Sequence, residues 1–303
     1  MRLPRRQIRK EGAMKEVGIV TDTNSLMTRE MANQYDVRLV PLYVTIAGKS
    51  YPENEVNLAE FYRDLPKWKE ENRLPTTAAP NVSDFLGAFR ELSQRAKGIV
   101  YVGYSSKLGI AISSAAQART RLKEESIETE VEIIDTYTGC GAQMLITLET
   151  ARMAKAGRSL AQVVEVCKKI RDRVSFIFLA DNLYYLAKGG RIHRARPWAA
   201  STISNTALLE MDISTGGQNT PVARCRTKGQ ALNALFDLVK QRAGDKVVHV
   251  AIDHADAPAE AEELKDKVSS EFKCAEVYVN QMQPVLTTHT GVGSRIFSWW
   301  SED

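Results

Sequence analysis

The sequence of 303 residues lacks the long hydrophobic runs of a membrane protein. No run approaches the roughly 18 to 20 apolar residues of a transmembrane helix. The N-terminal residues also lack the apolar stretch of a secretory signal. We therefore expect a soluble, cytoplasmic protein without a membrane span. Hydrophobic residues still make up 44% of the chain, enough for ordinary cores, and the length favours two domains over one.

Signatures of metal, disulfide and nucleotide chemistry are missing as well. The four cysteines are widely spaced and form no Cys-x-x-Cys pair, which argues against a zinc site or a disulfide framework. There is no Gly-x-x-x-x-Gly-Lys-Ser/Thr loop for nucleotide phosphates and no Gly-x-Ser-x-Gly nucleophile motif. We expect no metal, no cofactor and buried, structural thiols. A reactive thiol at Cys140 is the alternative, because that residue follows a predicted strand.

Outside its N-terminal segment, the chain has little charge imbalance. The formal net charge is +4, and the first 13 residues contain five basic residues and one acidic residue. The remainder is therefore close to electroneutral. We interpret residues 1–13 as a basic tail, expected to be disordered, and expect no nucleic acid partner.

Strand and helix patterns alternate in the first half of the chain. Short apolar runs predict strands, and longer amphipathic stretches predict helices between them. The expected strands are residues 17–20, 37–46, 98–103 and 131–135, and the expected helices are residues 83–97, 110–125 and 141–155. This alternation is typical of a three-layer, mainly parallel sheet, which we assign to an N-terminal domain of residues 14–158.

From Ser159 onward, the pattern contains more strands for each helix. Ser159 and Gln162 have the spacing of a capping box at the start of a helix. The expected strands are residues 175–180, 208–213, 220–226, 247–252 and 274–280, with helices at residues 229–242 and 258–272 and a hairpin turn at residues 216–219. We expect a C-terminal domain of residues 159–303 with a two-layer mixed sheet. His249 lies within a predicted strand and is interpreted as a structural histidine.

Hydroxyl- and glycine-rich motifs stand where strands should end or helices begin. They are residues 21–25 (Thr-Asp-Thr-Asn-Ser), 76–81 (Thr-Thr-Ala-Ala-Pro-Asn), 105–108 (Ser-Ser-Lys-Leu), 188–192 (Lys-Gly-Gly-Arg-Ile) and 289–293 (His-Thr-Gly-Val-Gly). Ligands of open parallel sheets gather at the carboxyl ends of strands, where free N–H groups suit an anion. We expect the motifs at Asp22, Ser105 and Asp135 to converge on one edge of the sheet. Simple helix capping is the alternative interpretation.

Taken in order, these motifs resemble the DegV family over about residues 17–299. Tyr-Leu-x-Lys-Gly-Gly-Arg-Ile and His-Thr-Gly are specific in combination. The resemblance implies a two-domain α/β protein with a fatty acid in a tunnel between the domains. It further implies that the chain presents the carboxylate of a long-chain fatty acid to a separate ATP-dependent fatty acid kinase subunit, which makes the acyl phosphate. The chain itself would be a binding subunit and not an enzyme.

The resemblance also implies which residues bind the ligand. The hydroxyl of Thr77 would hydrogen-bond the carboxylate, with backbone donors around Ser106 and Gly109. The resemblance also places Arg191, Arg226 and His289 near the carboxylate end, where phosphoryl transfer and kinase docking occur in the family. An arginine suits a carboxylate or an acyl phosphate, and a histidine can donate to either.

Two departures from the family pattern leave other functions open. Ala78 and Ala79 replace a serine and a glutamine, and Gly109 stands where a carboxylate-binding serine is expected. One alternative is a sensor for a different acid or lipid that is no longer coupled to a kinase. Another is a stand-alone acyl or phosphoryl transfer enzyme that uses His289 or Asp22 as its acid or base.

Overall fold

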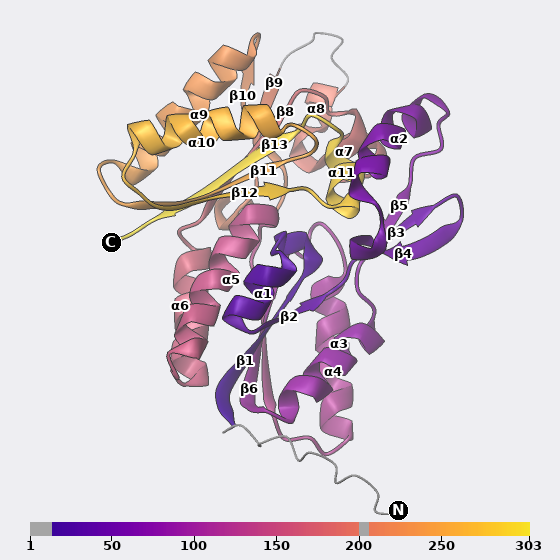
Figure 1. Cartoon of the computed structure of the whole chain (residues 1–303), viewed down its shortest axis with the longest axis vertical. Coiled ribbons are helices and arrows are strands. Elements are labelled where there is room, and N and C mark those ends of the chain that lie inside the picture. Colours follow the sequence, from indigo (N-terminus) through magenta and orange to yellow (C-terminus); the bar gives the residue numbers. More distant parts are fainter. Residues whose placement is uncertain (1–13, 200–205) are drawn as a thin grey trace, which may run out of the picture.

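The computed structural model describes residues 14–199 and 206–303 and contains two large sheets, one above the other in Figure 1. The first sheet is four-stranded and parallel, and the second is six-stranded and mixed. Both halves of the predicted α/β fold are thereby confirmed. The predicted tail of residues 1–13 lies outside the described residues. Within those residues, no helix has both the length and the apolar character needed to cross a bilayer.

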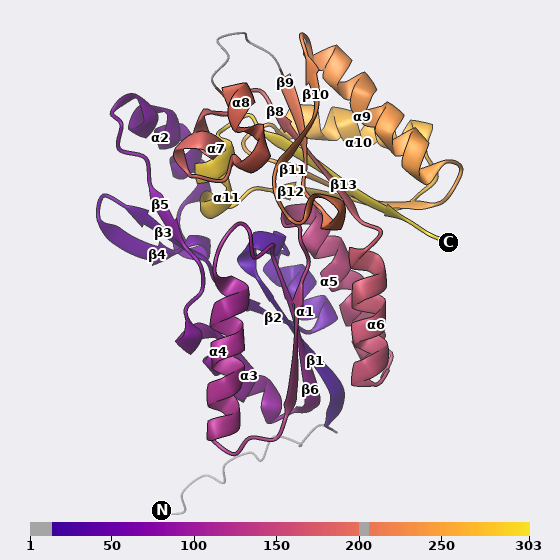
Figure 2. The same cartoon turned by 180° about the vertical axis from the view of Figure 1, so that it is seen from behind.

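The first sheet has the strand order β2-β1-β6-β7 and is covered on both faces. Its strands are β1 (Lys15–Asp22), β2 (Val37–Val40), β6 (Ala96–Gly103) and β7 (Glu130–Asp135). The helices around it are α1 (Arg29–Tyr35), α3 (Val82–Ser93), α4 (Ala111–Glu124), α5 (Cys140–Lys155) and α6 (Leu160–Arg171). Figures 1 and 2 show α3 and α4 on one face and α1, α5 and α6 on the other. Burial from both sides explains the continuous apolar runs at residues 17–20 in β1 and 98–103 in β6.

Helix α6 begins with the predicted capping box. The Ser159 side chain accepts from the Gln162 backbone, and the Gln162 side chain accepts from the Ser159 backbone. The helix packs against α5 and against β1, β6 and β7 of the first sheet. The domain boundary near residue 158 stays a prediction, and the packing of α6 favours a position after Arg171.

A small antiparallel lobe projects beside the first sheet. Its strands are β3 (Tyr43–Ile46), β4 (Lys49–Pro52) and β5 (Thr76–Ala78). Helix α2 (Leu58–Glu70) connects β4 to β5. The prediction of one strand over residues 37–46 is wrong, because β2 and β3 belong to different sheets. Between them lies Pro41, which has no backbone N–H to continue a ladder.

The second sheet has the order β10-β9-β8-β13-β11-β12. Its strands are β8 (Ser175–Ala180), β9 (Thr206–Glu210), β10 (Thr220–Cys225), β11 (Val248–His254), β12 (Cys274–Gln281) and β13 (Arg295–Ser301). Helices α9 (Lys228–Ala243) and α10 (Pro258–Glu271) cover its outer face. Shorter helices are α7 (Tyr184–Lys188), α8 (Arg196–Ala199) and α11 (Pro284–Thr290), with 3-10 turns η1 (Thr23–Ser25), η2 (Glu53–Glu55), η3 (His193–Ala195) and η4 (Ile213–Thr215). Strand β13, for which no strand was expected from the sequence, lies in the middle of this sheet.

Helix α5 joins the two sheets because it packs against both. It contacts β1 below it and β11 and β13 above it. At its first turn, the Gly141 N–H donates to the Asp253 carboxylate at 2.8 Å. A Cβ on Gly141 would lie 2.6 Å from the Cβ of Ala251, so this close approach requires glycine. The sheets therefore share one core around α5.

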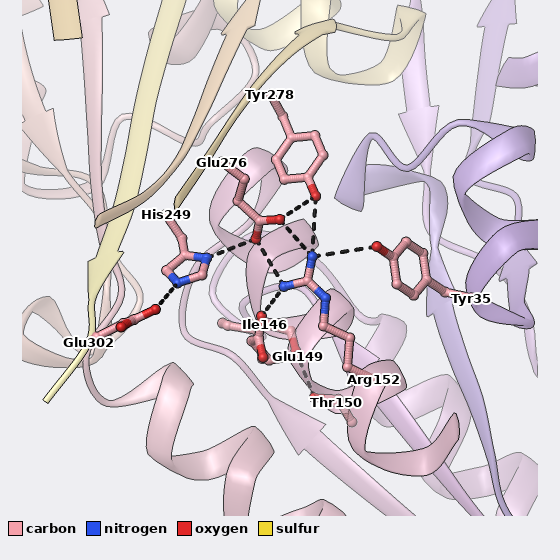
Figure 3. A network of polar contacts seen from close by, with 9 residues as sticks. All are labelled: Tyr35, Ile146, Glu149, Thr150, Arg152, His249, Glu276, Tyr278 and Glu302. Atoms are coloured by element: carbon pink, nitrogen blue, oxygen red, sulfur yellow. Dashed lines mark hydrogen bonds and ion pairs between the residues drawn. The ribbon is translucent and has the colours of Figure 1, made fainter. Parts of the chain in front are cut away.

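A polar cluster at the other end of α5, the Arg152 network, also bridges the two sheets (Figure 3). Its members are Tyr35, Glu149, Arg152, His249, Glu276, Tyr278 and Glu302. The Arg152 guanidinium pairs with Glu149 on its own helix and, at 2.6 Å, with Glu276 on β12. Glu276 also contacts Nδ1 of His249 at 2.8 Å, which confirms a structural role for that histidine. Glu149, His249 and Glu276 have the spacing of a cation site, but the guanidinium supplies the positive charge between the two glutamates.

Candidate functional site

A cavity of about 360 Å³ lies where the first sheet, the lobe and the second sheet meet. Most of the side chains around it are apolar. They come from the lobe, from the loop after β6, from the inner face of the second sheet and from α11; the lining includes Leu42, Ala78, Leu108, Ile110, Phe176, Phe178, Leu186, Met211, Val285, Leu286 and Ile296. The volume is within the range of small-molecule sites. The cavity therefore suits a largely apolar ligand.

Several polar side chains also line the cavity. We call four of them together with Gly109 the polar end: Thr77, Tyr104, Gly109, Arg191 and His289. Asn24, Asn219 and Thr290 are further polar residues of the lining. Strand β5 supplies Thr77, the loop after β6 supplies Tyr104 and Gly109, the turn after α7 supplies Arg191, and α11 supplies His289. Of the described residues that line the cavity, none carries a carboxylate, and Arg191 is the charged one. This distribution favours a ligand with a neutral or anionic polar group.

Thr77 and His289 form a hydrogen-bonded pair, with 2.8 Å between Oγ1 and Nε2. Burial of the imidazole, with the nearby charge of Arg191, lowers the pKa of His289 to about 3. The ring is therefore neutral near pH 7. If Nε2 carries the proton, it donates to Oγ1, and the Thr77 hydroxyl is free to donate to a ligand. Nδ1 is buried and has no partner among the described residues.

Two glycine motifs hold this histidine in place by allowing close packing between α7 and α11. A Cβ on Gly189, at the end of α7, would lie 2.3 Å from Nδ1 of His289. A Cβ on Gly291, at the end of α11, would lie 2.5 Å from the ring of Tyr185. Gly291 also has a φ of +83°, in the region that favours glycine. The Lys-Gly-Gly-Arg and His-Thr-Gly motifs thus pack directly against each other.

Arg191 links two loops at the polar end. Its Nε donates to the carbonyl of Leu108 at 3.2 Å, and Nη1 donates to the carbonyl of Gly189 at 2.5 Å. The guanidinium thereby ties the loop after β6 to the turn after α7. Its positive charge also acts on His289 and Tyr104 and lowers the pKa of both side chains.

A second, smaller hollow of about 280 Å³ shares several of these residues. Thr77, Arg191 and His289 line both spaces, and Lys188 lines only the second. Lys188 Nζ donates to the side chain of Asn72 at 3.0 Å. The Thr77–His289 pair therefore separates an apolar cavity from a hollow with basic side chains.

Of the six predicted ligand-binding residues, the structure brings four to the cavity: Thr77, Gly109, Arg191 and His289. Ser106 is exposed, and its N–H donates to the Asp135 carboxylate at 3.3 Å. Arg226 is exposed at the start of α9, where its N–H donates to Gln230. Neither residue lines the cavity. Ligand contacts by these two residues stay predictions that the geometry does not favour.

The motifs after β1, β6 and β7 lie at one end of the sheet, as parallel strands require. Their polar atoms are largely satisfied by hydrogen bonds within the protein. Asp22 accepts from Tyr101 at 2.6 Å and from the Gln143 side chain at 3.2 Å. Burial raises the pKa of Asp22 to about 6, but this residue does not line the cavity. Cys140 does line it, and burial raises the pKa of its thiol, as expected for an unreactive cysteine.

Sequence reasoning missed the cavity wall on the second sheet and the side chain of Tyr104. Phe176 and Phe178 face the cavity, whereas Ile177 and Leu179 face the outer core. Alternation along β8 predicts two such faces, but all four residues are apolar, so the pattern cannot tell which face binds a ligand. Tyr104 could have been found as an aromatic residue that directly follows a buried strand, at the end of the sheet where ligands bind.

Comparison with known proteins gives consistent matches over nearly the whole chain. A family model described as "uncharacterised protein, DegV family" matches residues 16–301. Protein DegV of Bacillus subtilis is 25% identical over 286 residues, covering 93% of this chain and 98% of that protein. A DegV domain-containing protein of Halalkalibacterium halodurans is 28% identical, covering 95% of this chain and all of its own length.

Solved structures of similar proteins share the fold. A DegV family protein from Thermus thermophilus, described by its fatty acid binding, has a TM-score of 0.86 at 24% identity, covering 95% of this chain and 100% of that one. DegV of Bacillus subtilis, described as a fatty acid binding protein, has a TM-score of 0.82 at 25% identity, with coverages of 96% and 100%. A DegV family protein from Eubacterium eligens, loaded with heptadecanoic acid, has a TM-score of 0.81 at 19% identity, with coverages of 94% and 100%.

Proposed function

The chain belongs to the DegV family, and on this premise we propose that it is a fatty-acid-binding protein whose cavity holds one long-chain fatty acid. The observation that carries the proposal is the shape of the site: an apolar cavity that ends in hydroxyl, imidazole and guanidinium groups without a carboxylate. The fatty acids of the similar solved structures support the same ligand class.

Each part of the ligand has a matching part of the cavity. The carboxylate accepts a hydrogen bond from the Thr77 hydroxyl, whose oxygen accepts from Nε2 of the neutral His289. Arg191 contributes a nearby positive charge, which favours the ionised acid. The acyl chain lies against the apolar walls, where each buried methylene contributes about 0.8 kcal/mol before the costs of binding.

We further propose that the bound carboxylate is presented to a separate ATP-dependent kinase subunit. In that reaction a carboxylate oxygen attacks the terminal phosphorus of ATP, the bond to the bridging oxygen breaks, and ADP leaves as the acyl phosphate forms. The hollow beside Thr77 supports this step, because Lys188 lines it on the far side of the Thr77–His289 pair and Arg191 lines both spaces. Basic side chains there would stabilise the incoming phosphates.

The geometry gives less support to a stand-alone transfer enzyme. Asp22 lies outside the cavity, beneath the hydroxyl of Tyr101. His289 has a pKa of about 3, far below the value near 7 that suits a general acid or base at neutral pH. A sensor that binds a lipid without passing it to a kinase would use the same cavity. An assay for acyl phosphate separates such a sensor from a protein that presents its ligand to a kinase.

The first experiment is native mass spectrometry of the purified protein, followed by identification of the released small molecule. We expect one fatty acid per chain. A protein that is purified empty and stays empty after incubation with C14 to C18 fatty acids would overturn the proposal. Adding ATP with a fatty acid kinase subunit should then produce acyl phosphate, trapped with hydroxylamine. Lipid bound without any acyl phosphate would favour the sensor.

A further inference from the structure

Tyr104 is a buried polar residue that the site described above leaves unexplained. It follows β6 directly, lines the cavity and has only 4% of its surface exposed. The backbone N–H of Ala111, at the start of α4, lies near the tyrosine oxygen and lowers the pKa of the phenol, against the larger raising effect of burial. Among the described residues, no acceptor is found for the hydrogen of this hydroxyl. A hydroxyl that faces a cavity and donates to no protein group has its hydrogen available for a ligand.

Gly109 makes room for this hydroxyl. A Cβ on Gly109 would lie 2.6 Å from the oxygen of Tyr104 and 3.3 to 3.4 Å from two of its ring carbons. The Cβ of any other residue at position 109 would therefore collide with the Tyr104 hydroxyl, whereas its distances to the ring carbons are only slightly shorter than ordinary contacts. The tyrosine oxygen occupies the place that a short side chain at position 109 would take.

The surroundings keep Tyr104 a hydrogen-bond donor. Burial and the negative charge of Asp22 raise the pKa of its phenol, so the hydroxyl keeps its proton at any physiological pH. Arg191, on the same side of the cavity, adds positive charge. A carboxylate only accepts hydrogen bonds, and this hydroxyl has a hydrogen that no protein group accepts, so the two groups are complementary.

We propose that the hydroxyl of Tyr104 donates the second side-chain hydrogen bond to the ligand carboxylate, alongside Thr77, in the space that Gly109 leaves open. The inference rests on the proposed function and adds a specificity-determining residue to it. Tyr104 thereby makes a site with glycine at position 109 selective for an acid over a neutral lipid of the same chain length.

The test is a set of four variants with measured dissociation constants for palmitate and for hexadecanol. Tyr104→Phe keeps the ring and removes the hydroxyl, and we expect it to weaken palmitate binding about ten- to a hundredfold. Hexadecanol, which lacks the charge, should lose several-fold less. Gly109→Ser alone should also weaken palmitate binding, because its Cβ displaces the Tyr104 oxygen.

The same serine should have the opposite effect once the hydroxyl is gone. In Tyr104→Phe with Gly109→Ser, the serine hydroxyl takes the vacated place, and palmitate affinity should recover at least several-fold. Tyr104→Phe with Gly109→Ala is the matched control, because it adds the Cβ without a hydroxyl and should not recover. A role in packing alone would not distinguish serine from alanine.

The outcomes separate this inference from the proposed function. If the unaltered protein binds no fatty acid, both fail. If it binds palmitate and Tyr104→Phe binds equally tightly, or if serine restores no more affinity than alanine, only the role of Tyr104 is overturned. Thermal unfolding of each variant shows whether it is folded. If Tyr104→Phe folds poorly, Gly109→Ser alone decides, because unchanged palmitate affinity in that variant overturns the role of Tyr104.

Discussion

Burial shifts the pKa values of ionisable residues around the cavity toward their neutral forms. Burial lowers the pKa of His289 to about 3 and raises those of Asp22 and Glu53 to about 6 and about 7. Glu53 accepts from the hydroxyl of Thr23 and from the N–H of Val285 at 3.0 Å. Neither Asp22 nor Glu53 lines the cavity, so these side chains hold the surrounding loops without placing a carboxylate against the ligand.

Loss of the Thr77 hydroxyl should weaken fatty acid binding. Thr77→Val keeps the shape of the side chain and removes a hydrogen bond to a charged group, so we expect about a ten- to hundredfold rise in the dissociation constant. Isothermal titration with palmitate measures it. Thr77→Ser keeps the hydroxyl and is the control. Equal affinity in Thr77→Val and the unaltered protein would exclude this contact with the carboxylate.

The neutral His289 should make the fold sensitive to acid. Its pKa is about 3 in the folded protein and near 6.5 when unfolded, so unfolding takes up a proton between these values. The contribution to stability is complete above about pH 6.5 and declines as the pH falls toward 3. His289→Gln should remove this part of the slope. Urea unfolding of both proteins from pH 4.5 to 7.5 measures it.

The difference between the two proteins is the decisive quantity in that experiment. The raised pKa values of Asp22, Glu53 and Asp253 act with the opposite sign, since they favour the folded state at lower pH. Their contributions are the same in both proteins and cancel. Parallel stability curves for His289→Gln and the unaltered protein would show that the imidazole is not buried as a neutral group.

At the scale of elements, α7 and α11 depend on glycine for their contact. Gly189→Ala would place a methyl group 2.3 Å from Nδ1 of His289 and push the imidazole away from Thr77. We expect weaker palmitate binding and a lower melting temperature. Gly87→Ala is the control, because the Cβ at this exposed position in α3 meets no atom within 4 Å. It should stabilise the helix slightly, by about 0.5 to 1 kcal/mol. Unchanged palmitate affinity in Gly189→Ala would contradict the contact.

Helix α5 and β12 are joined by the Arg152 network (Figure 3), so its removal should destabilise the protein. Arg152→Met leaves Glu149 and Glu276 without their cation, and we expect a loss of about 1 to 3 kcal/mol in the free energy of unfolding. Arg90→Met is the matched control, because Arg90 pairs with a glutamate at a more exposed site, where its side chain is 50% exposed. It should cost at most about 1 kcal/mol. Equal losses in the two variants would show that the network does not hold the sheets together.

At the scale of the whole molecule, the cavity is built by three separate parts: the loops of the first sheet, the lobe and the second sheet. A ligand that contacts all three should stabilise them together. With palmitate at a hundredfold excess over its dissociation constant, we expect about 2.7 kcal/mol of added stability and a melting temperature several degrees higher. Differential scanning calorimetry measures this shift. Two separate transitions, of which palmitate moves one, would show that the ligand contacts only one part.

Helix and strand patterns that depend on neighbouring residues were predictable from the sequence. The capping box at Ser159, the parallel first sheet and the mixed second sheet are confirmed, because periodicity and capping act over a few residues. The ordered motifs also indicated the family, which the family model confirms. Thr77, Arg191 and His289 could be singled out because each belongs to one of those motifs, and Gly109 because it directly follows one.

Tertiary structure alone decided how distant segments meet. Three features depend on partners far along the chain. Strand β13 inserts between β8 and β11, Phe176 and Phe178 form the cavity wall, and Ser106 lies in a turn that contacts Asp135. The same is true of the fit between Gly189 and His289. By itself, the sequence determined the local elements and the residue types of the site. Which of those residues share one cavity was decided by close packing between segments that no local pattern relates.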